Sequence, residues 1–318
     1  FAVLVAQSFT YSMFNIALNS QAVRLQKRMG KIMLGSLHGA WSIGAATSAA
    51  ISGWLASFLD LRLHLILVMS LCGLAFWVAS RFLLTNDEEG HSPETQPKHD
   101  VSWFKTPGYL WLLAVGLFAG MWPELVMMDW SAVFSQEVLA VDPTRGALPY
   151  TVFTGFMIIG RFASSWVTKH VHFSTMSAWG GLIGSVFMTA GVIFAATFAD
   201  SNVNLALTLQ ICCYALAGLG IASMVPSFFS AAGDIRGLST AQALSRMSFA
   251  NAVFVMVAKW VMGGLADGVG LVAAMIFPLI SLFIAGLIAA YVSKHSKRIR
   301  SEQLEAFPPT GSVPIAGN

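Results

Sequence analysis

The sequence predicts an all-α protein that crosses a membrane many times, and three observations lead to this class. The chain has 318 residues, of which 56% are apolar and only 10% are charged, whereas soluble domains carry about 25% charged residues. Long uncharged runs recur along it, each near the roughly 20 residues that a helix needs to cross the hydrocarbon. The runs do not alternate polar and apolar residues like the strands of a membrane barrel, so the spans are predicted to be helices.

Nine apolar runs are predicted to span the membrane, three before a hydrophilic stretch and six after it. They are residues 1–23, 32–59, 63–80, 106–134, 146–168, 172–199, 201–233, 237–266 and 268–293. Arg161 interrupts the fifth run, and the eighth run contains Arg246 and Lys259. The fourth run contains Glu124 and Asp129, and the other six contain no Asp, Glu, Lys or Arg, which favours the nine-span interpretation.

The basic residues are distributed unevenly among the connections between these runs. Arg62 and Arg145 lie in one alternate set, and Lys259 lies within a span. The other set contains fifteen of the eighteen Lys and Arg residues: Arg24, Lys27, Arg28, Lys31, Arg81, Lys98, Lys105, Arg161, Lys169, Arg236, Arg246, Lys294, Lys297, Arg298 and Arg300. Because Lys and Arg accumulate in cytoplasmic loops, this set and the C-terminus are predicted to be cytoplasmic. Phe1 would then lie outside at the start of a helix without a leader, which predicts a truncated chain.

The long hydrophilic connection, residues 84–106, has the composition of a flexible cytoplasmic linker. It separates residues 1–83, a partial N-terminal half with three spans, from residues 107–293, a C-terminal half with six. Residues 294–318 are predicted to be a cytoplasmic tail. Many secondary transporters consist of two six-helix halves, so three spans plus six fit a twelve-helix protein without its first three helices.

Several segments resemble a known family of transporters. Asn19-Ser20-Gln21-Ala22, the basic stretch 24–31 and the segment 35–44 (GSLHGAWSIG) resemble helices four and five of the major facilitator superfamily. Asp129-Trp130-Ser131 resembles the end of its helix seven, and residues 225–233 resemble part of helix ten. The nearest branch is that of bacterial sugar permeases of the fucose–proton symporter type. The resemblance implies nine of twelve helices: the last three of the N-terminal half and a complete six-helix C-terminal half.

The chain also departs from the pattern of these relatives. Asn15 and Gln26 stand where the relatives often carry an acidic residue. The loop after the fifth span, with Arg161 and Lys169, resembles the basic gating loop of the superfamily, but has Ser164 and Ser165 where an acid is usual. These departures put ordinary proton coupling and loop gating in question.

Ionisable residues inside the membrane are costly and are therefore functional candidates. Glu124 follows Pro123, which can break the helix, and is placed in the outer half of the membrane. Asp129 is placed near the outer interface, where a solvated or capping role is the alternative. Lys259, near the outer end of its span, is expected to pair with Glu124, with Asp129 as the other acid in reach. The alternative for Lys259 is that its side chain snorkels to the headgroups. The alternative for Glu124 is a role in packing only.

Neutral polar and aromatic residues supply further candidates. Asn15 and Asn19 share one helix face and, with Asn251, are candidate contacts for a hydroxylated solute. Trp41 and Trp130 are candidate stacking platforms for a sugar, although Trp is also frequent at membrane interfaces. His38 has an ordinary pKa suited to proton transfer, with a structural hydrogen bond as the alternative. The pairs Gly180 and Gly184, and Gly35 and Gly39, are predicted to serve helix packing.

The resulting hypothesis is a secondary active transporter of a small polar solute by alternating access, with protons as a candidate coupling ion. It is expected to be a multi-pass monomer in the lipid bilayer of the bacterial inner (plasma) membrane, without nucleic-acid partner, cofactor or metal. The cysteines, Cys72, Cys212 and Cys213, show no metal-binding spacing. An enzyme is disfavoured because His38 has no catalytic partner in its own span. A non-transporting sensor or scaffold derived from a transporter is the alternative.

Overall fold

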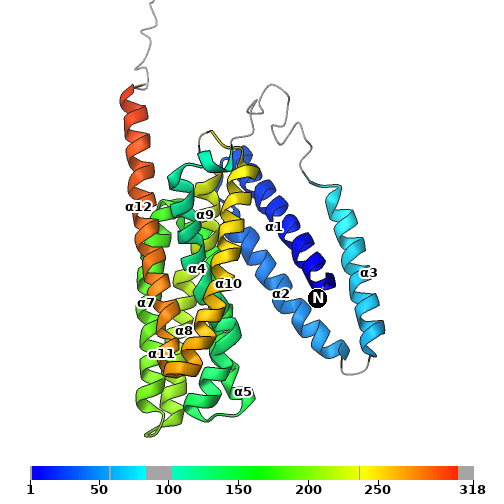
Figure 1. The fold of residues 1–318 in the computed structure, drawn as a ribbon, viewed down its shortest axis with the longest axis vertical. Coiled ribbons are helices and arrows are strands. Elements are labelled where there is room, and N and C mark those ends of the chain that lie inside the picture. Colours follow the sequence, from blue (N-terminus) through cyan, green and yellow to red (C-terminus); the bar gives the residue numbers. More distant parts are fainter. Residues whose placement is uncertain (1, 57–58, 84–101, 236, 307–318) are drawn as a thin grey trace, which may run out of the picture.

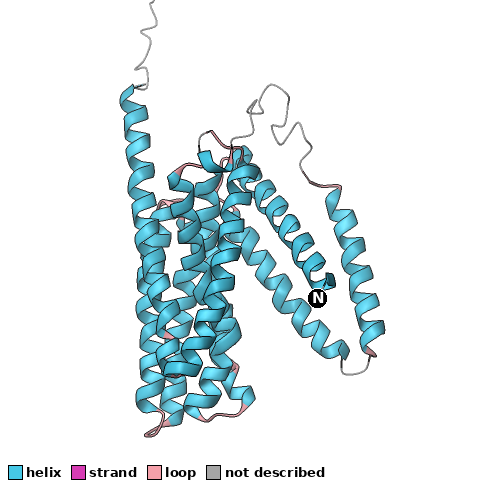
Figure 2. Cartoon of the chain, viewed as in Figure 1, coloured by secondary structure: helices cyan, strands magenta, loops and turns pink. Residues whose placement is uncertain are grey.

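The structure, a computed structural model, describes residues 2–56, 59–83, 102–235 and 237–306 (Figure 1). Within these ranges the chain is helical and contains no strand, which confirms the predicted all-α class (Figure 2). The long helices are α1 (Ala2–Met29), α2 (Leu34–Ala56), α3 (Leu61–Ser80), α4 (Gly108–Leu139), α6 (Leu148–Val167), α7 (Phe173–Phe198), α8 (Val203–Ile221), α9 (Met224–Gly233), α10 (Thr240–Val269) and α12 (Ile276–Ala306). Short elements are a 3-10 turn (Trp103–Lys105), α5 (Pro143–Gly146) and α11 (Leu271–Ala274).

Each of the nine predicted runs coincides with helical structure. The seventh run is divided between α8 and α9, and the ninth between α11 and α12. In the described part of the chain, six helical stretches are long and apolar enough to cross a membrane by length and composition: 62–80, 108–139, 173–198, 203–233, 240–269 and 271–295. The other three runs form α1, α2 and α6, and α2 is rich in Gly, Ala and Ser, which lowers its hydropathy. α12 continues beyond residue 293 into the predicted tail.

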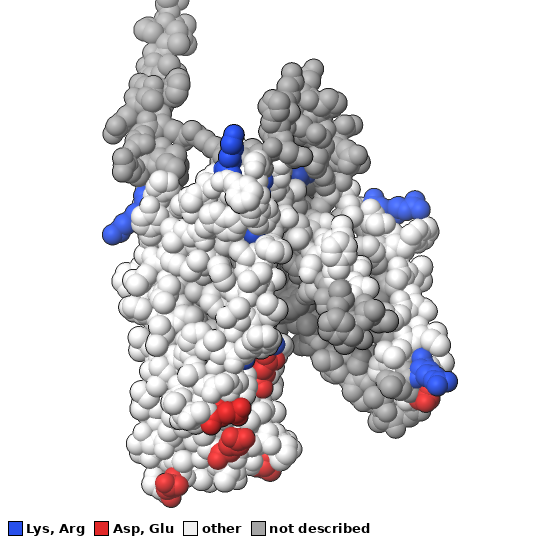
Figure 3. Space-filling view, in the orientation of Figure 1, with Lys and Arg blue, Asp and Glu red and all other residues white. Residues whose placement is uncertain are grey.

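The elements from α4 to α12 form one bundle, in which α7 packs against α8 and α12, α6 against α8, and α4 against α12. α1 approaches α10 and α9, and α2 approaches α6, whereas the main contact of α3 is with α2 (Figure 1). We call the end at which α1 ends and α2 begins the basic end, and the opposite end the acidic end. Figure 3 shows most of the visible Lys and Arg near the basic end and the visible Asp and Glu towards the acidic end.

Glycine permits the closest helix contacts. A Cβ at Gly180 of α7 would overlap the Gly220 carbonyl oxygen of α8, and Gly184 lies against Ile221. Between α2 and α6, Cβ atoms at Gly35 and Gly39 would collide with the opposite helix. The predicted packing role of both glycine pairs is therefore confirmed.

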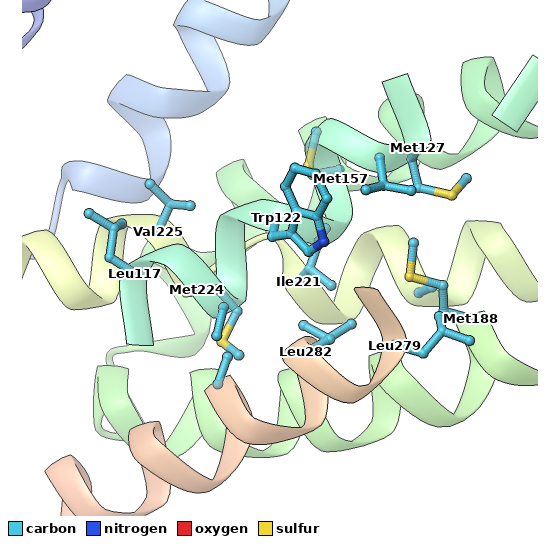
Figure 4. Packing of buried hydrophobic residues seen from close by; sticks show 14 of the residues in the cluster. Leu117, Trp122, Met127, Met157, Met188, Ile221, Met224, Val225, Leu279 and Leu282 are labelled. Carbon is cyan, nitrogen blue, oxygen red and sulfur yellow. The ribbon is translucent and has the colours of Figure 1, made fainter. Parts of the chain in front are cut away.

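Most of the buried core lies inside the six-helix half, with Val23 of α1 and Leu34 of α2 added from the other half. Figure 4 shows part of it, including Trp122 of α4, Met157 of α6, Ile221 of α8 and Met224 of α9, all nearly inaccessible to solvent. Because these side chains come from four different helices, they fix the relative positions of the helices that carry the charged residues described next.

Candidate functional site

A buried ion pair joins three helices. Glu124 lies in the middle of α4 and Arg161 lies in the last third of α6. The Arg161 Nη2 donates to Glu124 Oε2 at 2.8 Å, and the side chains are only 3% and 19% exposed. The other terminal nitrogen of Arg161 donates to the Ser42 hydroxyl of α2. This pair therefore connects the six-helix half to a helix that precedes the linker.

The structure corrects the expectation that Pro123 breaks the helix beside Glu124. α4 runs without interruption from Gly108 to Leu139. Proline has no N–H to donate to the residue four positions earlier, and the Ser281 hydroxyl of α12 lies 3.3 Å from the Ala119 carbonyl and 2.8 Å from the Pro278 carbonyl of its own helix. A neighbouring helix thus brings a hydroxyl within reach of the carbonyl that lacks the proline donor, as is common in membrane helices.

A different helix is broken beside the ion pair. Between α8 and α9 the regular helix is interrupted by a turn at Ala222 and Ser223, although both residues keep right-handed helical dihedral angles. A Cβ at Gly160, the residue before Arg161, would lie 2.7 Å from the Ala222 Cβ, so the break lies directly against α6. The Ser177 hydroxyl of α7 donates to the Ser223 carbonyl at 3.1 Å and lies 3.0 Å from its hydroxyl. Pro226 was the sequence signal that could have predicted this break.

Arg161 is not part of a gating loop, contrary to expectation. α6 continues through Arg161 to Val167, and only Lys169 lies in the exposed turn beyond it. Ser165 meets Ser36 of α2 with their hydroxyl oxygens 2.6 Å apart, and Ser164 faces Gly35. The serines that replace the usual acid therefore form contacts between α6 and α2.

Lys259 pairs with Asp129, and the expected pair of Lys259 with Glu124 is wrong. The Lys259 Nζ lies 2.7 Å from Asp129 Oδ2, with side chains 46% and 32% exposed. Asp129 is five residues after Glu124, or about 140° round an ideal helix. Because Pro123 does not interrupt α4, this rotation persists, so Glu124 meets Arg161 of α6 while Asp129 meets Lys259 of α10.

The uncharged candidate residues do not gather as one group around the Glu124–Arg161 pair. In α1, the Asn19 Nδ2 donates to Asn15 Oδ1 at 2.8 Å, so the two amides share a face as predicted. In α10, the Asn251 Oδ1 is buried without a hydrogen-bond partner among the described residues. Trp41 is 56% exposed, whereas Trp130 is half-buried beside Asp129 in α4.

His38 lies on α2 one turn before Ser42. Its ring stacks on Phe229 of α9 with centroids 6.1 Å apart, and its backbone carbonyl accepts from the Ser42 hydroxyl at 2.9 Å. His38 therefore supports the residue that contacts Arg161 and adds a second contact between α2 and the six-helix half.

A group of polar contacts at the basic end, which the sequence did not predict, fastens α1 to α9. Gln26 donates to the Ser230 hydroxyl at 2.8 Å, and its Oε1 accepts from two backbone N–H groups at the start of α2. Lys27 lies 3.1 Å from Asp234 and also donates to the Gly233 carbonyl. The replacement of an acid by Gln26 was noticed from the sequence, but its partners only become evident in the fold.

An open cavity of about 400 Å³ lies between α1 and α10. Its lining combines apolar and polar side chains: Met13, Ile16, Ala17, Ser20, Gln21, Arg24, Ala241 and Ser245. This volume falls within the range of about 300–1,000 Å³ typical of small-molecule sites. In the described ranges no three His, Cys, Asp or Glu side chains gather to ligate a metal.

The comparisons with known proteins agree with this architecture. An uncharacterised MFS-type transporter of Yersinia pestis is 27% identical over 222 residues, which is 69% of this chain and 53% of the relative. An uncharacterised transporter of Sinorhizobium fredii is 28% identical over 285 residues, 88% of this chain and 68% of the relative. Membrane protein MosC of Rhizobium meliloti is 30% identical over 196 residues, 61% and 45% of the two chains.

The chain thus spans about half to two thirds of the length of these relatives. The sequence profile of the Major Facilitator Superfamily matches residues 1–239, which include the helices that carry Glu124, Arg161 and Ser42. Together with the all-helical fold, this match shows that the chain belongs to the Major Facilitator Superfamily of membrane transporters.

Proposed function

We propose that this membrane transporter moves a small polar solute by alternating access and that the Glu124–Arg161 pair is its central charged site. The observation that carries the proposal is the buried pair itself, to which Ser42 is added from the other side of the linker. A charge held inside a membrane protein is costly and marks a substrate or proton pathway by default. The pair lies where two groups of helices meet, so a relative movement of these groups would change its contacts.

The pair has the asymmetry that a site for exchange requires. Arg161 is almost inaccessible, whereas the Glu124 side chain retains 19% exposure. A solute hydroxyl or a proton can therefore reach the carboxylate more easily than the guanidinium. Protonation of Glu124 removes its charge and weakens its attraction to Arg161, so proton uptake would loosen the contact between α4 and α6.

Alternating access is supported by the distribution of contacts between the two parts of the chain. Gln26 and Lys27 hold α1 against α9 at the basic end, and Arg161 holds Ser42 further along. We propose that these contacts separate when the transporter opens towards the basic end. The amides of Asn15, Asn19 and Asn251 then serve as neutral contacts for the solute, which favours a polar, uncharged substrate class.

Reconstitution of the full-length protein tests the function directly. Sugars and other small polar solutes are first screened for a thermal shift of the purified protein. Those that bind are then tested for counterflow in proteoliposomes, where external unlabelled solute should accelerate the exit of labelled solute. Binding without any flux across the membrane would contradict transport and favour a sensor derived from a transporter.

The orientation follows from the charge pattern, and we propose that the basic end faces the cytoplasm of a bacterial inner membrane. Cys72, Cys212 and Cys213 are first replaced by Ala. A cysteine at Lys31, in the exposed turn between α1 and α2, should then resist an impermeant thiol reagent in intact cells. A cysteine at Ser201, between α7 and α8, should react and serves as the matched control. The opposite labelling pattern would reverse the orientation.

A further inference from the structure

Four polar side chains between α4 and α8 are buried in the six-helix half. Ser131 and Ser135 lie one turn apart on α4, and Gln210 and Tyr214 lie one turn apart on α8. All four are fully inaccessible to solvent. Among the described residues, the Ser131 hydroxyl, the Gln210 Nε2 and the Tyr214 hydroxyl have no hydrogen-bond partner. Such a concentration of buried groups without partners requires an explanation, because most buried polar groups in folded proteins are paired.

Rearrangement of the amide does not satisfy the group. The Ser135 hydroxyl lies 3.2 Å from Gln210 Oε1 and 3.1 Å from the Ser131 carbonyl. A hydroxyl has one proton and can donate it to only one of them. If the Ser131 carbonyl receives the proton, the Gln210 amide can turn over and donate to Ser135. In either orientation Ser135 pairs with only one of the two head atoms of Gln210, which leaves the other head atom for Tyr214 or a further partner.

The position of the phenol is fixed by its surroundings. A Cβ at Gly191 of α7 would lie 2.6 Å from the Tyr214 ring, so this glycine makes room for the ring. The Gln210 side chain, one turn away, comes close to hydrogen-bonding distance of the Tyr214 hydroxyl. The ring therefore cannot easily swing its hydroxyl towards another part of the protein.

We propose that Ser131, Gln210 and Tyr214 hold an internal water molecule. Buried waters typically make about three hydrogen bonds to groups that the protein leaves unsatisfied, which is the number of side chains available here. Water both donates and accepts, so it fits either orientation of the Gln210 amide. A metal cation fits less well, because the four side chains include no carboxylate to balance its charge.

The proposed water lies on the same face of α4 as the buried ion pair. Ser131 follows Glu124 by seven residues, which returns to nearly the same face about 10 Å further along the helix. This displacement is towards the acidic end, beyond direct contact with the carboxylate. The water site is therefore separate from the Glu124–Arg161 pair, and its test does not depend on transport.

The variant Tyr214→Phe tests the proposal through the sign of its effect on thermal stability. If the hydroxyl binds water, its removal should lower the melting temperature by roughly 1–2 °C, the shift expected for one lost hydrogen bond of about 1 kcal/mol in a chain of this size. If the site is dry, removal of an unsatisfied hydroxyl should leave the melting temperature unchanged or raise it, which would overturn the proposal. Tyr291→Phe, at a 53% exposed position, is the control and should have little effect.

Radiolytic hydroxyl labelling provides a second measurement on the unmodified protein. Radicals that form from a bound water oxidise buried side chains beside it, so Tyr214 should be labelled faster than Phe134 after correction for intrinsic reactivity. Phe134 is also inaccessible and lies on α4. Labelling of Tyr214 at the rate of Phe134 would overturn the water site even if Tyr214→Phe melts earlier, since a direct bond to Gln210 would then account for the loss.

Discussion

Solute flux is expected to fall at least about tenfold when Glu124 is replaced by Gln, while the protein remains folded. The replacement keeps the shape of the side chain but removes its charge and its ability to exchange a proton. Hydrogen bonds to charged groups contribute about 1.5–3 kcal/mol, and 1.4 kcal/mol corresponds to about tenfold. Counterflow in proteoliposomes measures the effect, and wild-type flux for Glu124→Gln would rule out a central role for this carboxylate.

The stability of Arg161→Met distinguishes a buried pair from an incidental contact. This variant leaves the Glu124 carboxylate buried without its partner, and breaking a buried pair in this way costs about 3–5 kcal/mol. The double variant Arg161→Met with Glu124→Gln contains no uncompensated charge, so it should regain most of the lost stability. A double variant as unstable as Arg161→Met would show that Arg161 stabilises the bundle through other contacts.

Asp129→Asn is the matched control for both experiments. It neutralises a carboxylate on the same helix, in a pair whose side chains are 46% and 32% exposed. Exposed ion pairs contribute about 0–1 kcal/mol, so its effect on stability should be small and its effect on flux milder than that of Glu124→Gln. Equal losses from both variants would mean that charge on α4 matters in general and not at Glu124 in particular.

The spans could be predicted from the sequence because the hydrocarbon imposes a length and an apolar composition on every helix that crosses it. The partners of the charged residues could not be predicted from the sequence. Lys259 was assigned to Glu124 because both were placed at a similar depth, and depth alone does not fix the direction in which a side chain points. The 140° rotation between Glu124 and Asp129 was evident, but only the unbroken course of α4 through Pro123 shows that the rotation persists.

Arg161 was placed in a loop because the segment that contains Arg161 and Lys169 resembles the basic gating loop of the superfamily. Its burial within α6 depends on Glu124 and Ser42, which lie on two other helices and far away in the sequence. The break between α8 and α9 is a similar case, since Pro226 indicates a discontinuity but not the contact of the Ser177 hydroxyl with Ser223. Sequence patterns thus predicted the helices, while the pairing of groups between helices required the fold.

Gly180→Ala is expected to destabilise the six-helix half, because α7 and α8 meet through backbone at this position. The added methyl group would overlap the Gly220 carbonyl oxygen, and a backbone atom cannot move aside as the end of a flexible side chain can. Overpacking a close contact costs about 1–3 kcal/mol and occasionally more, which exceeds the gain of up to about 1 kcal/mol from the helix propensity of Ala. Thermal and denaturant unfolding of the purified protein should both show the loss.

Gly155→Ala on α6 provides the matched control, since a Cβ there meets no atom within 4 Å among the described residues. It makes the same chemical change in a helix of the same half, so only the space around the methyl group differs. The better helix propensity of Ala should then leave its stability unchanged or slightly higher. Equal destabilisation by both variants would show that glycine is required for helix flexibility. Loss of stability at Gly180 alone assigns the effect to the contact between α7 and α8. The position of the interrupted helix beside Arg161 depends on this contact.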